Sequence, residues 1–448
     1  MKISIIGTGY VGLVSGLCLS EIGHSVICID KDKSKIKKIN HGISPIHEKG
    51  IEKLLKKNIN KNFFATDDFD KAVESTSISI IAVGTPFKNN KIDTTFIKTA
   101  ANQIGNIIKI KKDFHVVVVK STVVPGTTDN VVKKILEKTS GLKLGIGFGL
   151  SMNPEFLREG EAVNDFMEPD RIVIGSSDPK TEMMVAKMYS LFKNVKIIKT
   201  NNRTAELIKY TSNSLLANLI SFSNEISNLS EKIGGIDIKN VMNGLYYDKR
   251  ISPIINNNER VFPPIISYIE SGCGFGGSCF PKDVKALISH GQSNGLKMNL
   301  LQAVIDINDR QPIKMINILK KDFKKLENIK IAILGLAFKP ETDDVRESPS
   351  LKVIQKLSRY NVSINAYDPI AKNEAKKLIT NKRVIYKNTL IESIKNVDAI
   401  MIMTKWNEFN SIPKIVNKFN PNVIVIDGRR ILQSDSVNNY RGIGFSIE

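Results

Sequence analysis

One cysteine lies in a stretch whose residue types could support covalent chemistry. Cys279 stands in the run Ser271-Gly-Cys-Gly-Phe-Gly-Gly-Ser-Cys-Phe-Pro-Lys-Asp283, surrounded by glycine and serine. Glycine backbones leave room for a substrate carbonyl to approach a thiol. The neighbouring Lys282 brings positive charge, which favours the thiolate, the nucleophilic form of cysteine. We therefore expect Cys279 to act as a covalent nucleophile.

A glycine-rich turn near the start of the chain indicates a dinucleotide site. The turn Gly7-Thr-Gly-Tyr-Val-Gly12 follows the apolar run Lys2-Ile-Ser-Ile-Ile6, which we expect to be a buried strand, and precedes a helix. Gly7 makes the tight turn, Gly9 lets the backbone approach a pyrophosphate, and Gly12 lets the helix pack closely on the strand. The free N–H groups at the start of the helix would bind the phosphates.

Asp30 distinguishes between two cofactors. It ends the second expected strand, His24-Ser-Val-Ile-Cys-Ile-Asp30, where a carboxylate can accept from both ribose hydroxyls and would repel a 2′-phosphate. The sequence therefore favours NAD over NADP. Lys35, one turn into the next helix, either reaches the adenosine or is a surface lysine. A nicotinamide cofactor with a nucleophilic cysteine indicates an enzyme that oxidises an alcohol to an aldehyde, captures it as a thiohemiacetal, oxidises it again and hydrolyses the thioester.

Polar residues follow two more strands of the first half. The run 77–83 leads into Gly84-Thr-Pro86, and the run 115–122 ends in Lys120-Ser-Thr122. Ligands of a doubly wound sheet bind beyond the carboxyl ends of its strands, so Thr85 and Thr122 are candidates for contact with cofactor or substrate. A helix cap is the alternative for each threonine.

Two further segments carry polar residues at helical spacing. Glu155 and Glu159 are four positions apart, so on a helical turn they would share a face, and alone they would mark an acidic surface helix. A helical pattern from Asn202 to about Leu245 puts Glu206, Lys209 and Asn213 on one face. Lys209 and Asn213 can both donate to an oxygen that becomes negative during a reaction, and the alternative is a plain polar helix face.

The second half repeats the strand and helix pattern of the first. Strands are expected at 327–336, 362–368, 397–404 and 422–427, with a helix at 348–360, but the turn Gly335-Leu-Ala-Phe-Lys-Pro340 lacks the dinucleotide fingerprint. We expect this half to bind another kind of nucleotide, with Lys339 and Arg346 suited to phosphate and a surface lysine as the alternative for Lys339.

The predicted fold class is α/β, with two Rossmann-like doubly wound domains joined by a long central helical segment. The expected domains are an NAD-binding domain over residues 1–200, the central segment over residues 201–310, which carries the candidate Lys, Asn and Cys and a dimer interface, and a C-terminal Rossmann-like domain over residues 311–448, which binds the other nucleotide. A long central helix would otherwise leave its apolar face bare, so we expect a homodimer.

Composition narrows the class of protein. The 448 residues suffice for two or three domains, and 42% apolar with 25% charged residues is typical of a globular protein. The net charge of +20 suits an anionic small substrate. Nucleic-acid binding is not indicated, because the sequence has no block of basic residues interleaved with aromatic ones. The four cysteines fit neither a disulfide scaffold nor a zinc pattern, so we expect no metal and a reducing, cytoplasmic compartment. We expect no signal peptide, and no membrane span, since no apolar run approaches ~20 residues.

The motifs together resemble those of the UDP-glucose/GDP-mannose dehydrogenase family, and within it the UDP-glucose 6-dehydrogenases. The resemblance runs over essentially the whole chain and rests on seven motifs in order: Gly7-Thr-Gly-Tyr-Val-Gly12, Val83-Gly-Thr-Pro86, Lys120-Ser-Thr122, Asn153-Pro-Glu-Phe-Leu-Arg-Glu159, Ala205-Glu-Leu-Ile-Lys-Tyr210, Gly276-Gly-Ser-Cys-Phe-Pro-Lys-Asp283, and Phe338-Lys-Pro340 with Arg346.

This resemblance implies a reaction and roles for particular residues. UDP-glucose, two NAD⁺ and water would give UDP-glucuronate and two NADH. Cys279 would attack the aldehyde, and Lys209 and Asn213 would stabilise the alkoxide and thiohemiacetal oxygens. The remaining catalytic residues would be Thr122 and Glu155, which position water and assist proton transfer, and Asp283, which supports that water during thioester hydrolysis.

The resemblance also implies the binding residues. NAD would be held by Gly7, Gly9, Val11, Gly12, Asp30, Lys35, Thr85, Thr122 and Arg346, with Glu159 and Lys282 at the junction of nicotinamide and substrate. The sugar nucleotide would be held by Glu155, Phe156, Leu157, Glu159, Lys209, Asn213, Phe275, Gly276, Phe280 and Lys339, and by Arg250 from a partner subunit. Arg250 lies 29 positions before Cys279, farther than in the relatives, because of an extra stretch at 256–264, and Arg260 is the alternative for its role.

Other functions remain as alternatives. The same chemistry could act on GDP-mannose or a UDP-N-acetylhexosamine, although Cys279-Phe-Pro-Lys-Asp283 is closer to the UDP-glucose enzymes. A catalytically silent NAD-binding scaffold would not need Cys279, Lys209, Asn213 and Asp283. A single-step hydroxyacid dehydrogenase would need neither the second nucleotide domain nor the thiol loop, and a nucleic-acid binder would explain only the charge.

Overall fold

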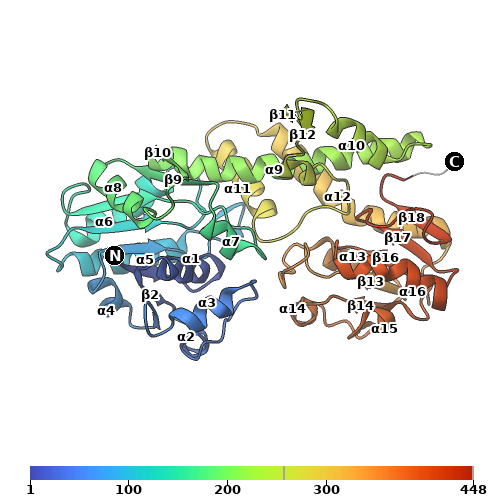
Figure 1. Cartoon of the computed structure of the whole chain (residues 1–448), viewed down its shortest axis with the longest axis horizontal. Helices are drawn as coiled ribbons and strands as arrows, with labels where there is room; N and C mark the ends of the chain where they lie inside the picture. The colour runs from blue at the N-terminus through green and yellow to red at the C-terminus, as the bar shows by residue number, and fades with distance from the viewer. Residues whose placement is uncertain (256–257, 446–448) are drawn as a thin grey trace. The chain divides into compact units, whose positions relative to one another are not determined.

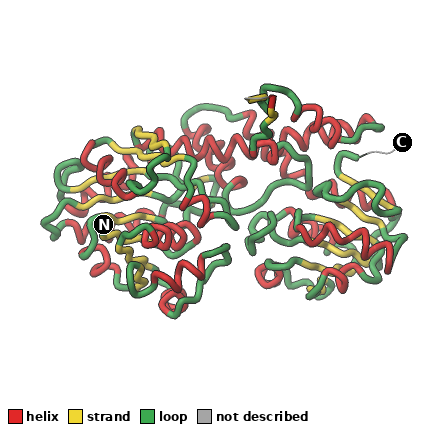
Figure 2. The backbone as a smooth tube through the Cα atoms, in the orientation of Figure 1, coloured by secondary structure: helices red, strands yellow, loops and turns green. Residues whose placement is uncertain are grey.

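The computed structural model describes residues 1–255 and 258–445. It divides into two compact units, Met1–Ser212 and Asn213–Glu448. Each unit contains a sheet covered by helices, so the α/β fold predicted from the sequence is confirmed (Figures 1 and 2).

The first unit is built on a sheet that, within the described residues, has eight strands in the order β10-β9-β8-β7-β4-β1-β2-β3. The strands are β1 (Lys2–Ile6), β2 (Ser25–Ile29), β3 (Phe63–Thr66), β4 (Ile78–Ile81), β7 (His115–Val119), β8 (Phe148–Met152), β9 (Arg171–Ser176) and β10 (Lys196–Thr200). Neighbouring strands pair in parallel except β8 and β9, which are antiparallel. This order places a crossover between β1 and β4, and ligands of doubly wound sheets bind where the strand order reverses.

Both faces of this sheet are buried. In β7, Val116 and Val118 belong to one apolar cluster and Val117 and Val119 to the other, as the alternation of a strand requires. The covering helices are α1 (Tyr10–Glu21), α2 (Lys33–Asn40), α3 (Ile51–Asn58), α4 (Phe69–Glu74), α5 (Thr95–Ile108), α6 (Lys133–Ser140), α7 (Ala162–Met167) and α8 (Pro179–Met188). A π-helix, η1 (Thr128–Val132), precedes α6, and a small hairpin pairs β5 (Phe87–Lys88) with β6 (Lys91–Ile92).

The predicted long central helix is shorter than expected. Helix α9 (Asn202–Ile233) ends at Gly234 and Gly235, which both have positive φ, and Asp237 then caps α10 (Ile238–Tyr246) by accepting from the Lys239 N–H. The helix expected to run to about Leu245 is therefore two helices. Glycine at positive φ is a common helix stop, and aspartate is a favoured N-cap.

The second unit contains an all-parallel sheet in the order β15-β14-β13-β16-β17-β18 within its described residues. Its strands are β13 (Lys330–Leu334), β14 (Ser363–Tyr367), β15 (Val384–Tyr386), β16 (Ala399–Ile402), β17 (Ile424–Asp427) and β18 (Asn439–Gly442). Its helices are α11 (Phe280–Ser293), α12 (Asn299–Asp322), α13 (Pro349–Leu357), α14 (Lys372–Leu378), α15 (Leu390–Ile394) and α16 (Ile412–Phe419), with 3₁₀ turns η3 (Pro264–Tyr268) and η4 (Asn407–Ser411). A hairpin pairs β11 (Ile254–Ile255) with β12 (Glu259–Arg260).

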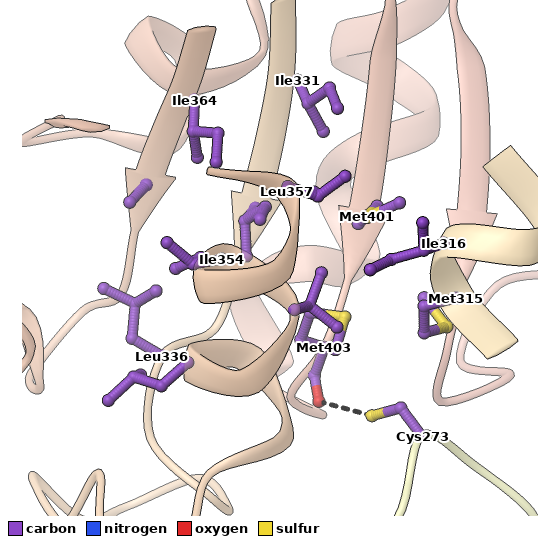
Figure 3. Packing of buried hydrophobic residues seen from close by; sticks show 14 of the residues in the cluster. Cys273, Met315, Ile316, Ile331, Leu336, Ile354, Leu357, Ile364, Met401 and Met403 are labelled. Carbon is purple, nitrogen blue, oxygen red and sulfur yellow. Dashed lines mark hydrogen bonds between the residues drawn. The ribbon is translucent and has the colours of Figure 1, made fainter. Parts of the chain in front are cut away.

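One face of this sheet packs around the cysteine loop. Ile331 of β13 and Ile364 of β14 share an apolar cluster with Ile354 of α13 and Met315 of α12 (Figure 3). Cys273 joins the same cluster, is fully buried and donates its S–H to the Met403 carbonyl at 3.4 Å. Packing of Cys273 into this core fixes one end of the segment that carries Cys279.

Across the residues that the structure describes, no helix combines the length and apolar character needed to cross a bilayer.

Candidate active site

The glycine-rich turn has the geometry that a bound pyrophosphate requires. Gly7 has φ +103°, and a Cβ on Gly12 would lie 1.9 Å from the Gly7 carbonyl oxygen, so neither position accepts a side chain. A Cβ on Gly9 would meet nothing within 4 Å, which leaves open space beside that backbone. Val11 lies in the first turn of α1, and among the described residues no side chain caps this helix. The N-terminus of α1 therefore fits an anionic phosphate.

Asp30 is oriented by the same turn. Its Oδ2 accepts from the Thr8 N–H at 2.9 Å and the Thr8 hydroxyl at 2.6 Å, and its Oδ1 accepts from the Asp32 N–H at 3.0 Å. Burial acts to raise the pKa of Asp30, but these hydrogen bonds and the charge of the partly exposed Lys35 hold it below its usual value. A carboxylate oxygen can accept more than one hydrogen bond, so an ionised Asp30 fits ribose hydroxyls.

The structure joins the two candidate threonines. The buried Thr85 donates from its hydroxyl to the Thr122 carbonyl at 2.8 Å, and Ser121 donates to the Val83 carbonyl at 2.7 Å. Thr85 therefore bridges the ends of β4 and β7 and does not cap a helix. These two loops meet at the carboxyl edge of the sheet, where a doubly wound fold binds ligand.

Glu155 and Lys209 form a buried ion pair. Lys209 Nζ lies 2.9 Å from Glu155 Oε1, and the Leu157 N–H donates to Glu155 Oε2 at 2.6 Å. Burial alone would raise the pKa of Glu155, but the Lys209 charge and hydrogen bonds hold it below its usual value. The pair therefore places a negative and a positive group side by side away from bulk water.

The expectation that Glu155 and Glu159 share a helical face is wrong. Residues 153–158 form an irregular loop, Glu155 is buried, and Glu159 is partly exposed. Pro154 disfavours helical backbone at the residue before it and supplies no N–H, and Asn153 is held by its side-chain donation to the Val173 carbonyl. The spacing of four therefore has no helical meaning here.

The loop also presents two candidate substrate residues. Phe156 and Leu157 are partly exposed. The Arg171 guanidinium lies 3.9 Å from the centre of the Phe156 ring, and Lys209 Nζ lies 5.4 Å from it. Cation–π contacts of this kind hold the ring in place beside the buried ion pair.

Glu206, which the sequence placed on one face with Lys209 and Asn213, has a different use. Its fully buried carboxylate accepts from the N–H groups of Gly126 and Thr128 and from the Thr128 hydroxyl at 2.6 Å. It thereby caps the helix that begins at Thr128 and ties α9 to the turn after Thr122. Burial raises the pKa of Glu206 to about 7 in spite of these donors.

In the second unit, Cys279 stands at the N-cap of α11. It is exposed, whereas Cys18, Cys28 and Cys273 are buried. The Ser278 hydroxyl lies 3.5 Å from the Cys279 sulfur. The dipole of the helix favours negative charge at this end, which suits a thiolate.

Three further candidates meet beside this helix. Asp283, fully buried in the first turn of α11, accepts from the Asn213 side-chain amide at 2.7 Å. Its other oxygen lies 2.7 Å from Lys282 Nζ. The carboxylate is therefore compensated by one cation and one amide, an arrangement that orients the Asn213 side chain.

Two polar side chains that the sequence analysis did not identify, the buried Asn308 and the partly buried Arg429, shape the cysteine loop. Asn308 accepts from the Phe275 N–H at 2.7 Å and donates to the Phe275 carbonyl at 3.1 Å, and Arg429 donates to the Gly274 carbonyl at 3.1 Å. The rings of Phe275 and Phe280 meet edge to face at 6.0 Å. A polar residue at a buried position of α12 was the available signal for Asn308.

The same loop packs against the segment that carries the phosphate candidates. A Cβ on Gly276 would lie 2.6 Å from the Glu347 carbonyl oxygen, and the Gly277 N–H donates to the Arg346 carbonyl at 2.8 Å. Arg346 pairs with Asp344 at 2.7 Å, and Lys339 Nζ lies 5.8 Å from the centre of the Phe338 ring. The structure thus brings Gly276 and Arg346 together within the second unit.

Arg250 lies outside these groupings. Its side chain is 89% exposed and pairs with Asp248 at 2.5 Å. Arg260, the alternative for its role, donates to the carbonyls of Tyr247 and Ser252 at 3.0 and 2.7 Å and so holds the hairpin loop together. Residues 256 and 257 of the extra stretch lie outside the described residues.

The sequence analysis gave Lys120 no functional role. It is buried, and its ammonium donates to the Asn153 side-chain oxygen at 3.1 Å. Tyr189 donates to the same oxygen at 2.5 Å. A lysine that directly follows an all-apolar strand was the available signal.

Over residues 1–255 and 258–445, no group of three or more His, Cys, Asp or Glu is placed to bind a metal.

Comparison with known proteins covers nearly the whole chain. Sequence profiles of the UDP-glucose/GDP-mannose dehydrogenase family match its NAD binding domain to residues 1–193, its central domain to residues 203–310 and its UDP binding domain to residues 332–434. The chain is 37% identical over 437 residues to UDP-glucose 6-dehydrogenase AglM of Haloferax volcanii, which covers 96% of this chain and 97% of that relative.

Solved structures agree with this similarity. A UDP-glucose dehydrogenase from the hyperthermophilic archaeon Pyrobaculum islandicum is 33% identical with a TM-score of 0.89, over 99% of this chain and 98% of that one. A UDP-D-ManNAc dehydrogenase from Pyrococcus horikoshii is 28% identical with a TM-score of 0.83, over 99% of each chain.

Proposed function

Since the chain belongs to the UDP-glucose/GDP-mannose dehydrogenase family and is an NAD-dependent sugar-nucleotide 6-dehydrogenase, we propose that its substrate is UDP-glucose and its product UDP-glucuronate. Full-length similarity to the UDP-glucose 6-dehydrogenase of Haloferax volcanii supports this choice of sugar. The sequence after the thiol, Phe280-Pro-Lys-Asp283, supports it as well.

The observation that carries the chemistry is the position of Cys279. It is an exposed thiol at the N-terminus of α11, one turn before a buried carboxylate that holds an amide and an ammonium. Such a thiol can bond to an aldehyde carbon and keep the intermediate on the enzyme between two oxidations.

The reaction then divides among the residues of this chain. NAD⁺ held by the Gly7–Gly12 turn and by Asp30 would supply the hydride acceptor for both oxidations. The C6 hydroxyl gives its proton to a water that Thr122 and Glu155 position, the Lys209 ammonium stabilises the alkoxide that forms, and Asn213 donates to the same oxygen. The Cys279 thiol then adds to the aldehyde: its sulfur bonds to the carbon, and the thiol proton passes to the aldehyde oxygen, which completes the thiohemiacetal.

Hydrolysis of the thioester uses the carboxylates. After the second oxidation, water adds to the thioester carbon and the sulfur leaves as thiolate, which yields the carboxylate of the product. Glu155, with Thr122, positions this water and takes its proton, and Asp283 supports the arrangement through Asn213. The low pKa of Glu155 keeps it ionised and able to accept that proton.

The test measures NADH formed per sugar nucleotide consumed, with UDP-glucose, GDP-mannose and UDP-N-acetylglucosamine offered in parallel. Two NADH from UDP-glucose alone is the expected result. Two NADH from another nucleotide would keep the mechanism and replace the sugar, a possibility raised by similarity to the UDP-D-ManNAc dehydrogenase of Pyrococcus horikoshii. One NADH per sugar would remove the covalent step.

The proposal includes a homodimer built on α9. Leu215, Phe222 and Leu229 are spaced seven apart on this helix and are 50%, 45% and 56% exposed. Apolar residues at this spacing form a stripe that a second helix can cover. A partner subunit would also supply Arg250. Light scattering of the eluted protein should give twice the chain mass, and a monomer would contradict the interface.

A further inference from the structure

A buried carboxylate outside the candidate catalytic residues joins three parts of the first unit. Glu48, between α2 and α3, is 6% exposed. It accepts from the Gly160 N–H at 2.6 Å and the Ala162 N–H at 3.0 Å. The Tyr10 hydroxyl donates to the same carboxylate, and the Gly160 N–H also lies 3.0 Å from that hydroxyl oxygen. These contacts link α1 to the end of the loop that starts at Asn153.

The cost of this arrangement indicates a specific use. Among the described residues Glu48 forms no ion pair, and burying a carboxylate without one is expensive unless strong donors replace its water. The Tyr10 phenol is such a donor. Burial, and then the hydrogen bond to Glu48 and the charge of that group, raise the pKa of Tyr10, which favours the protonated phenol that donates to Glu48.

The two elements that meet at Glu48 carry the expected binding residues of two different ligands. Tyr10 is the first residue of α1 and follows Gly9, the residue beside the expected pyrophosphate. Gly160 ends the loop that holds Glu155 and the exposed side chains of the sugar site. A hydride passes only when donor and acceptor carbons are well aligned, and an error near 1 Å can reduce the rate about 100-fold.

We propose that Tyr10 and Glu48 are positioning residues that hold the phosphate-binding turn and the Glu155 loop in one register, so that cofactor and sugar nucleotide meet in the geometry of hydride transfer. This inference rests on the proposed function. Neither residue is among those assigned to the reaction itself. Each half-site keeps its own binding contacts without the pair, and what is lost is their relative placement.

The central test is Tyr10→Phe, which removes one oxygen atom. We expect kcat to fall about 10-fold. The KM values for NAD⁺ and for the sugar nucleotide should change less than about twofold, and the melting temperature should fall, because the buried Glu48 carboxylate loses its phenol donor. The deuterium isotope effect on kcat with substrate deuterated at C6 should rise, because hydride transfer becomes slower than the other steps. Tyr360→Phe removes an exposed phenol hydroxyl that contacts Lys320 and is the matched control.

Glu48→Gln tests the same link from its other end. It should give the same separation of kcat from KM, and the double variant should be no slower than Glu48→Gln alone, because both changes break one network. Multiplicative losses, an unchanged kcat, or a rise confined to the KM for NAD⁺ would each overturn the inference. An inactive wild-type protein would instead refute the proposed function, so the two failures are distinguishable.

Discussion

The ammonium of Lys209 and the carboxylate of Glu155 lie 2.9 Å apart with side-chain exposures of 5% and 6%. Neither charge is compensated by bulk water, so each depends on the other. Removing one partner of a buried pair typically costs about 3–5 kcal/mol, because it strands the remaining charge. The pair therefore contributes to folding and, in the proposed mechanism, to chemistry as well, and the two contributions can be separated.

Lys209→Ala should lower the oxidation rate about 100-fold while the affinity for NADH stays within about twofold. It should also lower the free energy of unfolding, because Glu155 is left unpaired. The double variant Lys209→Ala with Glu155→Gln removes both charges, so its stability should recover while its rate does not. Stopped-flow absorbance at the NADH band and urea denaturation measure the two quantities. A double variant that regains activity would contradict the role of Lys209.

Cys279→Ser should stop the reaction after the first oxidation or at an ester. A serine hydroxyl is a weaker nucleophile than a thiolate, and alkoxide is a poorer leaving group, so hydrolysis slows as well. NADH should fall short of two per sugar. Mass spectrometry of the intact protein distinguishes the two stopping points: a sugar-nucleotide adduct indicates the ester, and its absence indicates a stop after the first oxidation. Cys273→Ala, at a buried packing position, should retain full stoichiometry. Complete turnover by Cys279→Ser would remove the thioester from the mechanism.

Glu206 should make stability fall as the pH rises. Its folded pKa of about 7 lies above the ordinary value of 4.5, so the native state holds the proton more tightly than the unfolded state. The resulting stability is complete below about pH 4.5 and is lost as the pH passes through about 7, which amounts to about 3 kcal/mol. Glu206→Gln should remove this dependence, and Glu225→Gln, at an exposed position of α9, should not. Equal slopes in urea titrations of wild type and Glu206→Gln would contradict the assignment.

Alanine substitutions of Arg250 and Arg260 should have different effects, the first on substrate binding and the second on local order. Arg250→Ala should raise the KM for the sugar nucleotide about 10-fold with no change in melting temperature, because its exposed side chain contacts only the neighbouring Asp248 among the described residues. Arg260→Ala removes hydrogen bonds to two carbonyls of the hairpin loop, so it should increase hydrogen exchange around residues 247–252. If Arg260→Ala alone raises KM with exchange unchanged, the two roles are reversed.

Secondary structure was predicted most accurately where the local sequence pattern agrees with the position of the segment in the folded core. The run from Lys2 to Ile6 is a strand with those bounds, because an apolar pentapeptide before Gly7 has few other ways to be buried. The NAD cofactor and family were also predicted from contiguous motifs, and the profile matches confirm them. The helical spacing of Glu155 and Glu159 misled because residues 153–158 form an irregular loop, in which a spacing of four does not place two side chains on one face.

Long-range partners lay beyond sequence reasoning. Glu48 meets Gly160 across 112 positions, and nothing around residue 48 indicates where its carboxylate points. The pairing of Glu206 with Gly126 and Thr128 is hidden for the same reason, since its spacing from Lys209 suggested a shared polar face. Roles set by distant N–H groups become visible only when the chain is folded.

In each sheet an aspartate directly follows the second strand of the chain: Asp30 follows β2 and Asp368 follows β14. The two carboxylates differ in how much capacity to accept hydrogen bonds they keep for a ligand. Asp30 keeps acceptor capacity toward solvent, whereas Asp368 is buried and accepts in the described chain from Leu336, Ala337, Ile370, Ala371 and Trp406. A carboxylate with those five donors has nothing left to offer a ribose. The second sheet thus uses the aspartate after its second strand to hold its own loops and Trp406, and this carboxylate is not available for the ribose contact that Asp30 can make.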